Sequence, residues 1–126
     1  MTLIVHVSFE INGDQDAFEA WYLPLVEKMR AAPGCIGYDY LVDPSRRGVG
    51  RMIEVWETPE ARTAYQTSPY HVEMVARGSR DFGMANLSAH RWRGEDHVHG
   101  ERPRTETPIA GRDELNRLVA GYVAEH

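Results

Sequence analysis

The segment from Arg51 to Ala61 limits the fold more than any other part of the sequence, because its pattern predicts a strand that runs directly into a capped helix. Alternate residues of a strand share one face, and one face here carries Met52, Glu54 and Trp56. The Thr58-Pro59 pair that follows suits an N-cap and a first helical turn. A carboxylate and an indole therefore share a strand face that a small domain must cover, either with packed core or with a pocket.

The hydrophobic pattern of the remaining chain predicts an α+β fold. Alternation predicts strands at 2–11, 35–43, 50–58 and 87–93. Helical spacing predicts one helix with Asp16 as its N-cap, a kink at Pro24 and an end at Pro33-Gly34, and two further helices at 59–66 and from 68 onward. The order strand, helix, strand, strand, helix, strand is the ferredoxin-like βαββαβ arrangement with a four-stranded antiparallel sheet.

One face of such a sheet has no cover of its own, because both helices of the arrangement lie on the other face. An uncovered sheet face in a small protein needs a partner, and a second copy of the chain is the simplest one. We therefore expect a homodimer.

The chain divides into a domain at 1–93 and a C-terminal extension at 94–126. The polar stretch 94–111 predicts a linker or an extended arm. Its His97-x-His99 pair is a weak metal signal without other ligands at a familiar spacing, so we expect no metal site. From Arg112 an amphipathic helix follows, which must dock on its own domain, cross to a partner subunit or cover a pocket mouth.

Composition argues against several classes of function. A net charge of −5 disfavours a nucleic-acid surface. No apolar run is long enough to cross a bilayer, so we expect no membrane association. The single cysteine, Cys35, excludes an intramolecular disulfide and fits a reducing cytoplasm.

Two residues are candidate proton acceptors, and the sequence leaves the choice open. His71 follows the start of a helix, and histidine titrates near neutral pH; the alternative is a histidine on the helix surface. Glu54 could act as a base among apolar walls; the alternative is a structural glutamate bonded to a helix terminus or to neighbours of Arg51. Aromatic and sulfur-containing side chains are the candidate lining of a substrate pocket: Trp21, Tyr22, Met52, Tyr65, Tyr70 and Met74.

Several short motifs occur in an order that resembles the antibiotic biosynthesis monooxygenase domain over residues 1–93. They are Pro33-Gly34-Cys35-Ile36-Gly37-Tyr38, Asp43-Pro44, Glu54-Val55-Trp56-Glu57, Glu60-Ala61 and Ser68-Pro69. The resemblance implies a dimer whose two sheets form a shared α/β barrel, with a pocket in each subunit between sheet and helices. It also implies an enzyme that oxidises a polyketide-like phenol or anthrone with molecular oxygen, without metal or flavin.

Trp56 matches the strand tryptophan that lines the pocket in such oxygenases, which makes it a candidate catalytic residue beside His71 and Glu54. Two positions depart from the relatives that oxidise anthrones. Those relatives carry asparagine where this chain has Met52, and tyrosine where it has Arg62. Heme cleavage is not expected, because Val75 occupies the place of the helix histidine that heme-degrading relatives need.

Three alternatives keep the fold and change the function. A cyclase or isomerase would use the same pocket for enolisation. A flavin-assisted oxygenase would receive reduced flavin from a partner reductase, because the sequence has no glycine motif for nucleotide binding. A ligand-binding module would bind a small aromatic molecule without catalysis.

Overall fold

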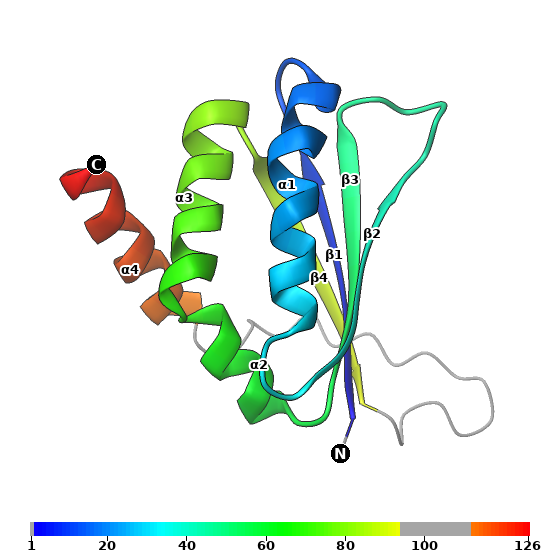
Figure 1. Ribbon diagram of the computed structural model, residues 1–126, viewed down its shortest axis with the longest axis vertical. Helices are drawn as coiled ribbons and strands as arrows, with labels where there is room; N and C mark the ends of the chain where they lie inside the picture. Colours follow the sequence, from blue (N-terminus) through cyan, green and yellow to red (C-terminus); the bar gives the residue numbers. More distant parts are fainter. Residues whose placement is uncertain (1, 94–111) are drawn as a thin grey trace.

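The structure is a computed structural model that describes residues 2–93 and 112–126, with the backbone alone at 85–93 and 112. Its elements are β1 (Leu3–Glu10), α1 (Gln15–Arg30), β2 (Cys35–Val42), β3 (Val49–Trp56), α2 (Pro59–Gln66), α3 (Pro69–Phe82), β4 (Ala85–Arg93) and α4 (Arg112–Glu125). Helices α1 and α3 lie on one side of the sheet, with α4 outside α3 (Figure 1). The expected linker and its His97-x-His99 pair lie outside the described residues.

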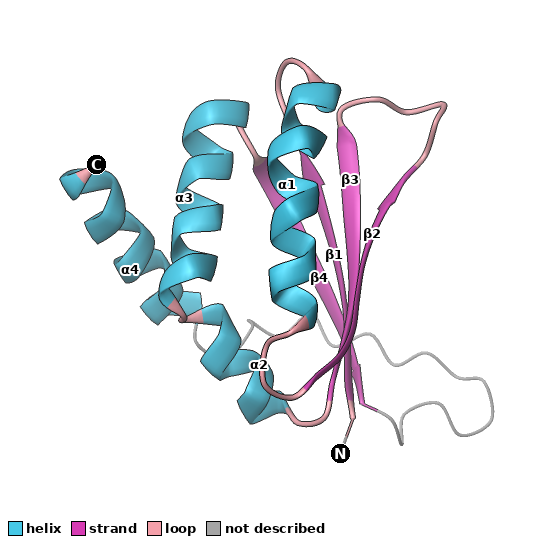
Figure 2. Ribbon diagram, viewed as in Figure 1, coloured by secondary structure: helices cyan, strands magenta, loops and turns pink. Residues whose placement is uncertain are grey.

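The four strands form one antiparallel sheet in the order β2-β3-β1-β4 (Figure 2). Strand β3 lies inside the sheet, where Glu54 pairs with Val5 on β1 and with Tyr38 on β2. This is the ferredoxin-like topology, and it confirms the predicted fold class.

The two faces of the sheet differ in burial as the alternation predicts. On β3, Met52, Glu54 and Trp56 are buried beneath the helices. On the opposite face, Ile53 and Val55 are only half-buried within this single chain. The helices therefore cover the face that carries the carboxylate and the indole, and the other face has no layer over it among the described residues.

Helix α1 begins differently from the prediction. Its N-cap is Asp14, whose carboxylate accepts hydrogen bonds from the backbone N–H groups of Asp16 (2.9 Å) and Ala17 (3.3 Å). The assignment of Asp16 as the cap is therefore wrong, because the turn places Asp14 at the first open N–H groups. The helix continues through Pro24 to Arg30.

The turn between α1 and β2 packs closely on α2. Gly34 has a φ of +80°, and a Cβ atom built there would lie 2.5 Å from the Cβ of Ala61. The Gly34 carbonyl also accepts a hydrogen bond of 2.8 Å from the Glu57 N–H, and Thr58 caps α2 through the Ala61 N–H at 3.1 Å. These contacts fix α2 against the end of β3, where Trp56 lies.

Helix α4 packs on the outer side of α3 in the same chain (Figure 1). Leu115 on α4 is buried, and the Tyr122 hydroxyl donates a hydrogen bond of 3.3 Å to Glu73 on α3. The apolar stripe of α4 thus contacts its own domain, which is one of the three placements that the sequence left open.

Candidate active site

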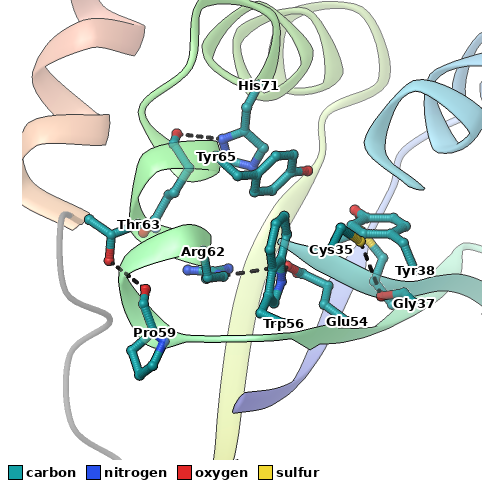
Figure 3. Close-up of polar contacts among 12 residues, drawn as sticks. Cys35, Gly37, Tyr38, Glu54, Trp56, Pro59, Arg62, Thr63, Tyr65 and His71 are labelled. Carbon is teal, nitrogen blue, oxygen red and sulfur yellow. Dashed lines mark hydrogen bonds and ion pairs between the residues drawn. The ribbon is translucent and has the colours of Figure 1, made fainter. Parts of the chain in front are cut away.

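Glu54 is the centre of a buried polar network where β3 ends and α2 begins (Figure 3). Its Oε1 atom accepts a hydrogen bond of 2.9 Å from Trp56 Nε1 and one of 3.4 Å from Arg62 Nε. Only 2% of Glu54 and 5% of Arg62 are exposed, and Trp56 is fully buried. The partners of Glu54 are thus an indole and a guanidinium, and not the helix terminus or the neighbours of Arg51 that the structural alternative named.

Tyr65 connects this network to the other candidate residues. Its ring lies 4.8 Å from Trp56, 4.6 Å from His71, 5.9 Å from Tyr70 and 6.3 Å from Tyr38, measured between ring centroids. Figure 3 shows Tyr65 between His71 and Trp56. The fold therefore brings together five predicted site residues that come from β3, α2 and α3: Glu54, Trp56, Tyr65, Tyr70 and His71.

His71 is held in one orientation in the interior, with 7% of its surface exposed. Its Nδ1 atom lies 2.7 Å from the Gln66 carbonyl oxygen. Because a carbonyl only accepts, Nδ1 carries the proton and Nε2 keeps its lone pair. Burial, with a smaller contribution from the charge of Arg62, lowers the pKa of His71 to about 4. His71 is thus a neutral imidazole at neutral pH, and the alternative of a surface histidine is wrong.

Two tyrosines enclose Met52, the residue at the position where relatives carry asparagine. The Tyr22 and Tyr38 hydroxyls lie 3.0 Å apart, Tyr38 donates to the Met52 sulfur at 2.6 Å, and Tyr22 also contacts that sulfur. Burial raises the pKa of both hydroxyls. Tyr38 was missed as a site residue, although its place in the strand alternation, directly opposite Glu54, was a signal for it.

A pocket of about 350 Å³ opens beside Tyr65 and Tyr70, between the end of α1 and helix α2. Its walls are mainly apolar, and the chain's single lysine lies at it; the lining includes Lys28, Ala32, Pro33, Ala61, Tyr65 and Tyr70. The volume lies at the lower end of the range for small-molecule sites. Tyr65 forms part of the pocket wall and also contacts Trp56, so it separates the pocket from the Glu54 network.

Trp21 and Met74 belong to other surroundings. Trp21 packs on Phe18 and Phe82, at centroid distances of 5.9 and 5.3 Å, and the Arg77 guanidinium lies 5.7 Å from its ring. Met74 belongs to α3 and is packed in the core. Neither lines the pocket beside Tyr65.

Four buried side-chain polar atoms have no hydrogen-bond partner within the part of the chain that the structure describes. They are Arg62 Nη1, Tyr65 Oη, Gln66 Oε1 and Tyr70 Oη. All four lie on α2 or at the start of α3. Buried polar atoms of this kind call for a ligand, water or ion, so this region has the unsatisfied hydrogen-bonding capacity of a binding site.

The described residues contain no group of three metal-ligating side chains. Within the same residues, no helix is long and apolar enough to span a membrane. The described side chains at the site supply an imidazole, a carboxylate paired with a guanidinium, and phenol and indole rings.

Comparison with known proteins identifies the family. The family model described as antibiotic biosynthesis monooxygenase matches residues 2–77, and the chain belongs to this family. No curated protein matches the chain by sequence.

Solved structures share the fold. A candidate antibiotic biosynthesis monooxygenase from Chloroflexus aurantiacus is 27% identical, with a TM-score of 0.62 over 81% of this chain and 98% of its own. Another from Deinococcus radiodurans is 15% identical, with a TM-score of 0.65 over 82% and 97%. SnoaB, a cofactor-independent oxygenase from Streptomyces nogalater, is 15% identical, with a TM-score of 0.64 over 74% and 92%.

Proposed function

We propose that this protein is a small monooxygenase that oxidises an ionisable aromatic substrate, a polyketide-like phenol or anthrone, with molecular oxygen. The observation that carries the proposal is a neutral imidazole packed against an aromatic wall: His71 lies 4.6 Å from Tyr65, whose ring lies 4.8 Å from Trp56. Membership of a family named for monooxygenases supports the reaction class. The description of SnoaB as a cofactor-independent oxygenase supports a reaction without metal or flavin.

The roles of the residues follow from their protonation and position. His71 Nε2 accepts a proton from the substrate, and Trp56 and Tyr65 hold the flat ring system. The carbanion gives its electrons to oxygen, a carbon–oxygen bond forms, and the protonated His71 returns the proton to the peroxide. For an anthrone, loss of water then gives the quinone, so that anthrone and O₂ become anthraquinone and water. The substrate supplies all the electrons.

Substrate entry is proposed through the pocket beside Tyr65 and Tyr70. Because Tyr65 separates this pocket from Trp56, the ring of Tyr65 has to move aside when substrate enters. Tyr22 and Met52, which are packed in the core, would form the fixed backing behind the bound ring.

We also propose a homodimer through the outer sheet face. Ile36 and Leu41 are exposed on β2, and Ile53 and Val55 on β3 are half-buried in the single chain. Apolar strand residues of this kind fit the face of a second sheet. The free thiol of Cys35 agrees with a cytoplasmic setting. Val55→Asp should convert the dimer to a monomer, measured by light scattering; a wild-type monomer at high concentration would contradict the proposal.

The deciding experiment is oxygen consumption by the metal-stripped protein with anthrones and naphthols, with and without reduced flavin. Oxygen uptake without flavin, together with quinone absorbance, is the expected result, and His71→Asn should abolish it. Uptake that needs reduced flavin would favour a flavin-assisted oxygenase. No uptake, with ligand still bound, would favour a cyclase, an isomerase or a binding module.

A further inference from the structure

Helix α2 carries most of the unsatisfied hydrogen-bonding capacity in the described part of the chain. Three of the four buried atoms without a partner there belong to Arg62, Tyr65 and Gln66. Tyr65 and Gln66 lie three and four positions after Arg62, so each is a neighbour of Arg62 on the surface of the helix. Each such atom costs about 1–3 kcal/mol if nothing binds it. We call Arg62 Nη1, Tyr65 Oη and Gln66 Oε1 the open atoms of α2.

The Arg62 guanidinium is fixed at one edge and open at the other. Its Nε donates to Glu54 Oε1 at 3.4 Å, and the same oxygen accepts from Trp56 Nε1 at 2.9 Å. Glu54 therefore holds the guanidinium and the indole next to each other (Figure 3). The Nη1 group, one of the open atoms of α2, keeps its two N–H bonds for another acceptor.

The acceptor that best fits a buried guanidinium is an anionic oxygen. Arginine keeps its charge in proteins, and its N–H groups form short, strong hydrogen bonds to oxyanions. In a low-dielectric interior such a contact is stronger than in water. A neutral hydrocarbon ligand would leave Nη1 without a partner, whereas a ligand with an ionised hydroxyl would supply an acceptor.

We infer that Arg62 is the anion-binding residue of the site and takes the ionised oxygen of a phenolate or enolate beside Trp56. Glu54 is then a positioning residue, which orients Arg62 and Trp56 and does not itself accept the substrate proton. This assignment of the substrate class rests on the proposed function, because the aromatic part of the ligand comes from it. The anion-binding step can be measured without any reaction with oxygen.

The charge of Arg62 also acts on His71, the proposed proton acceptor. The charge of Arg62 contributes to the lowered pKa of His71, after burial, which places the two side chains within electrostatic reach. A substrate hydroxyl that loses its proton to His71 would leave its negative charge to Arg62. The two residues thus divide the work, with one taking the proton and the other binding the anion.

The test uses a nitronaphthol, whose ionised form absorbs visible light, and the methyl ether of the same compound. Titration of the bound probe gives its pKa in the site. For wild type we expect a bound pKa at least one unit below that of the free probe, which is about a tenfold preference for the phenolate. Arg62→Gln should remove most of this shift, and Arg62→Lys should keep part of it. Affinity for the methyl ether should be unchanged.

A matched control removes a positive charge elsewhere. Arg47 is exposed and pairs with Asp16 on the surface, so Arg47→Gln should leave the probe titration unchanged. If Arg62→Gln does not fold, the double variant Glu54→Leu/Arg62→Met removes both charges of the buried pair, a replacement that proteins often tolerate. It should bind the methyl ether and lose the phenolate preference.

Three results would overturn the inference. They are an unshifted probe pKa in wild type, a shift that persists without Arg62, and failure of wild type to bind the probe at all. Oxygen uptake is a separate readout: a shifted probe without any oxygen uptake would retain the anion site and refute the oxygenase. Oxygen uptake with an unshifted probe would support the oxygenase and refute the anion site.

Discussion

The indole N–H of Trp56 donates a hydrogen bond of 2.9 Å to the carboxylate of Glu54, two residues earlier on the same strand. Both side chains lie on the covered face of β3, because residues at this spacing point in the same direction. The bond connects the aromatic wall of the site to the buried ion pair between Glu54 and Arg62. Neither the ring nor the guanidinium can reorient without loss of a contact to the same oxygen.

Trp56→Phe should separate the role of the ring from that of the N–H group. Phenylalanine keeps an aromatic surface and removes the donor to a buried carboxylate, so the free energy of unfolding should fall by about 2 kcal/mol in urea denaturation. Turnover should fall as well, because Arg62 loses its fixed position. Trp21→Phe is the matched control, since Trp21 is half-buried and packs against other rings and Arg77, away from the Glu54 carboxylate. An equal loss in both variants would contradict the special role of the bond.

His71 should make the protein less stable in mild acid. The folded protein binds the His71 proton only near pH 4, whereas an unfolded histidine binds it near pH 6.5. Between these values the unfolded chain holds more protons, so the free energy of unfolding falls as the pH falls. Between pH 7 and pH 5 the contribution of His71 amounts to a loss of about 2 kcal/mol.

Comparison with His71→Asn isolates this contribution. The asparagine amide can still donate to the Gln66 carbonyl but does not titrate, and other titrating groups cancel between the two proteins. Urea denaturation at pH 7 and pH 5 should show a smaller loss of stability for the variant than for wild type. Parallel pH profiles would mean that His71 has an ordinary pKa in the folded state.

The covered face of the sheet could be predicted from the sequence, because alternation has a period of two and only one face is packed against helices. Met52, Glu54 and Trp56 are buried together for this reason. The partner of Glu54 could not be predicted in the same way. It depends on the rotation of α2, which turns Arg62 towards the sheet and Ala61 towards Gly34.

The burial of His71 could not be predicted from the sequence pattern either. Ser68-Pro69 fixes where α3 begins, but the rotation of that helix depends on packing against Tyr65 and the Gln66 carbonyl. The N-cap of α1 was misassigned because both Asp14 and Asp16 suit the position, and only the backbone of the turn decides between them. Strand alternation alone thus places Glu54 and Trp56 on one face, whereas the Glu54–Arg62 contact and the burial of His71 depend on how the helices pack.

Gly34 and Gly13 offer a test of how tightly the α1–β2 turn packs on α2. Both have a positive φ, but a Cβ at Gly13 meets nothing within 4 Å, whereas one at Gly34 lies 2.5 Å from Ala61 Cβ. Gly13→Ala should cost about 1 kcal/mol from backbone strain alone. Gly34→Ala should cost about 3 kcal/mol, because the clash adds to the strain. Thermal denaturation of both variants measures the difference.

A second substitution identifies the cause of that difference. Ala61→Gly removes the atom that the new Cβ would meet, so the double variant Gly34→Ala/Ala61→Gly should recover the part of the loss that is due to the clash. A double variant as unstable as the sum of the two single ones would show that the turn does not approach α2 as closely as the structure has it.

Helix α4 should stabilise the domain through its buried stripe, and two apolar residues on it make a matched pair. Leu115 is 8% exposed against α3, whereas Val123 is 52% exposed. Leu115→Ala should lower the free energy of unfolding by about 2–3 kcal/mol, because it removes packed methyl groups. Val123→Ala should change it by less than about 0.5 kcal/mol.

Removal of residues 95–126 tests the same contact as a whole. It deletes α4 and with it every contact that α4 makes to α3, including the Tyr122–Glu73 hydrogen bond of 3.3 Å. The truncated chain should therefore melt at a lower temperature, while light scattering should give the same number of subunits as for the full-length protein, since α4 packs on its own chain. A truncated protein that dissociates would instead indicate that α4 also contacts the partner subunit. A truncated protein with an unchanged melting temperature, together with a silent Leu115→Ala variant, would show that the α3–α4 contact does not form in solution.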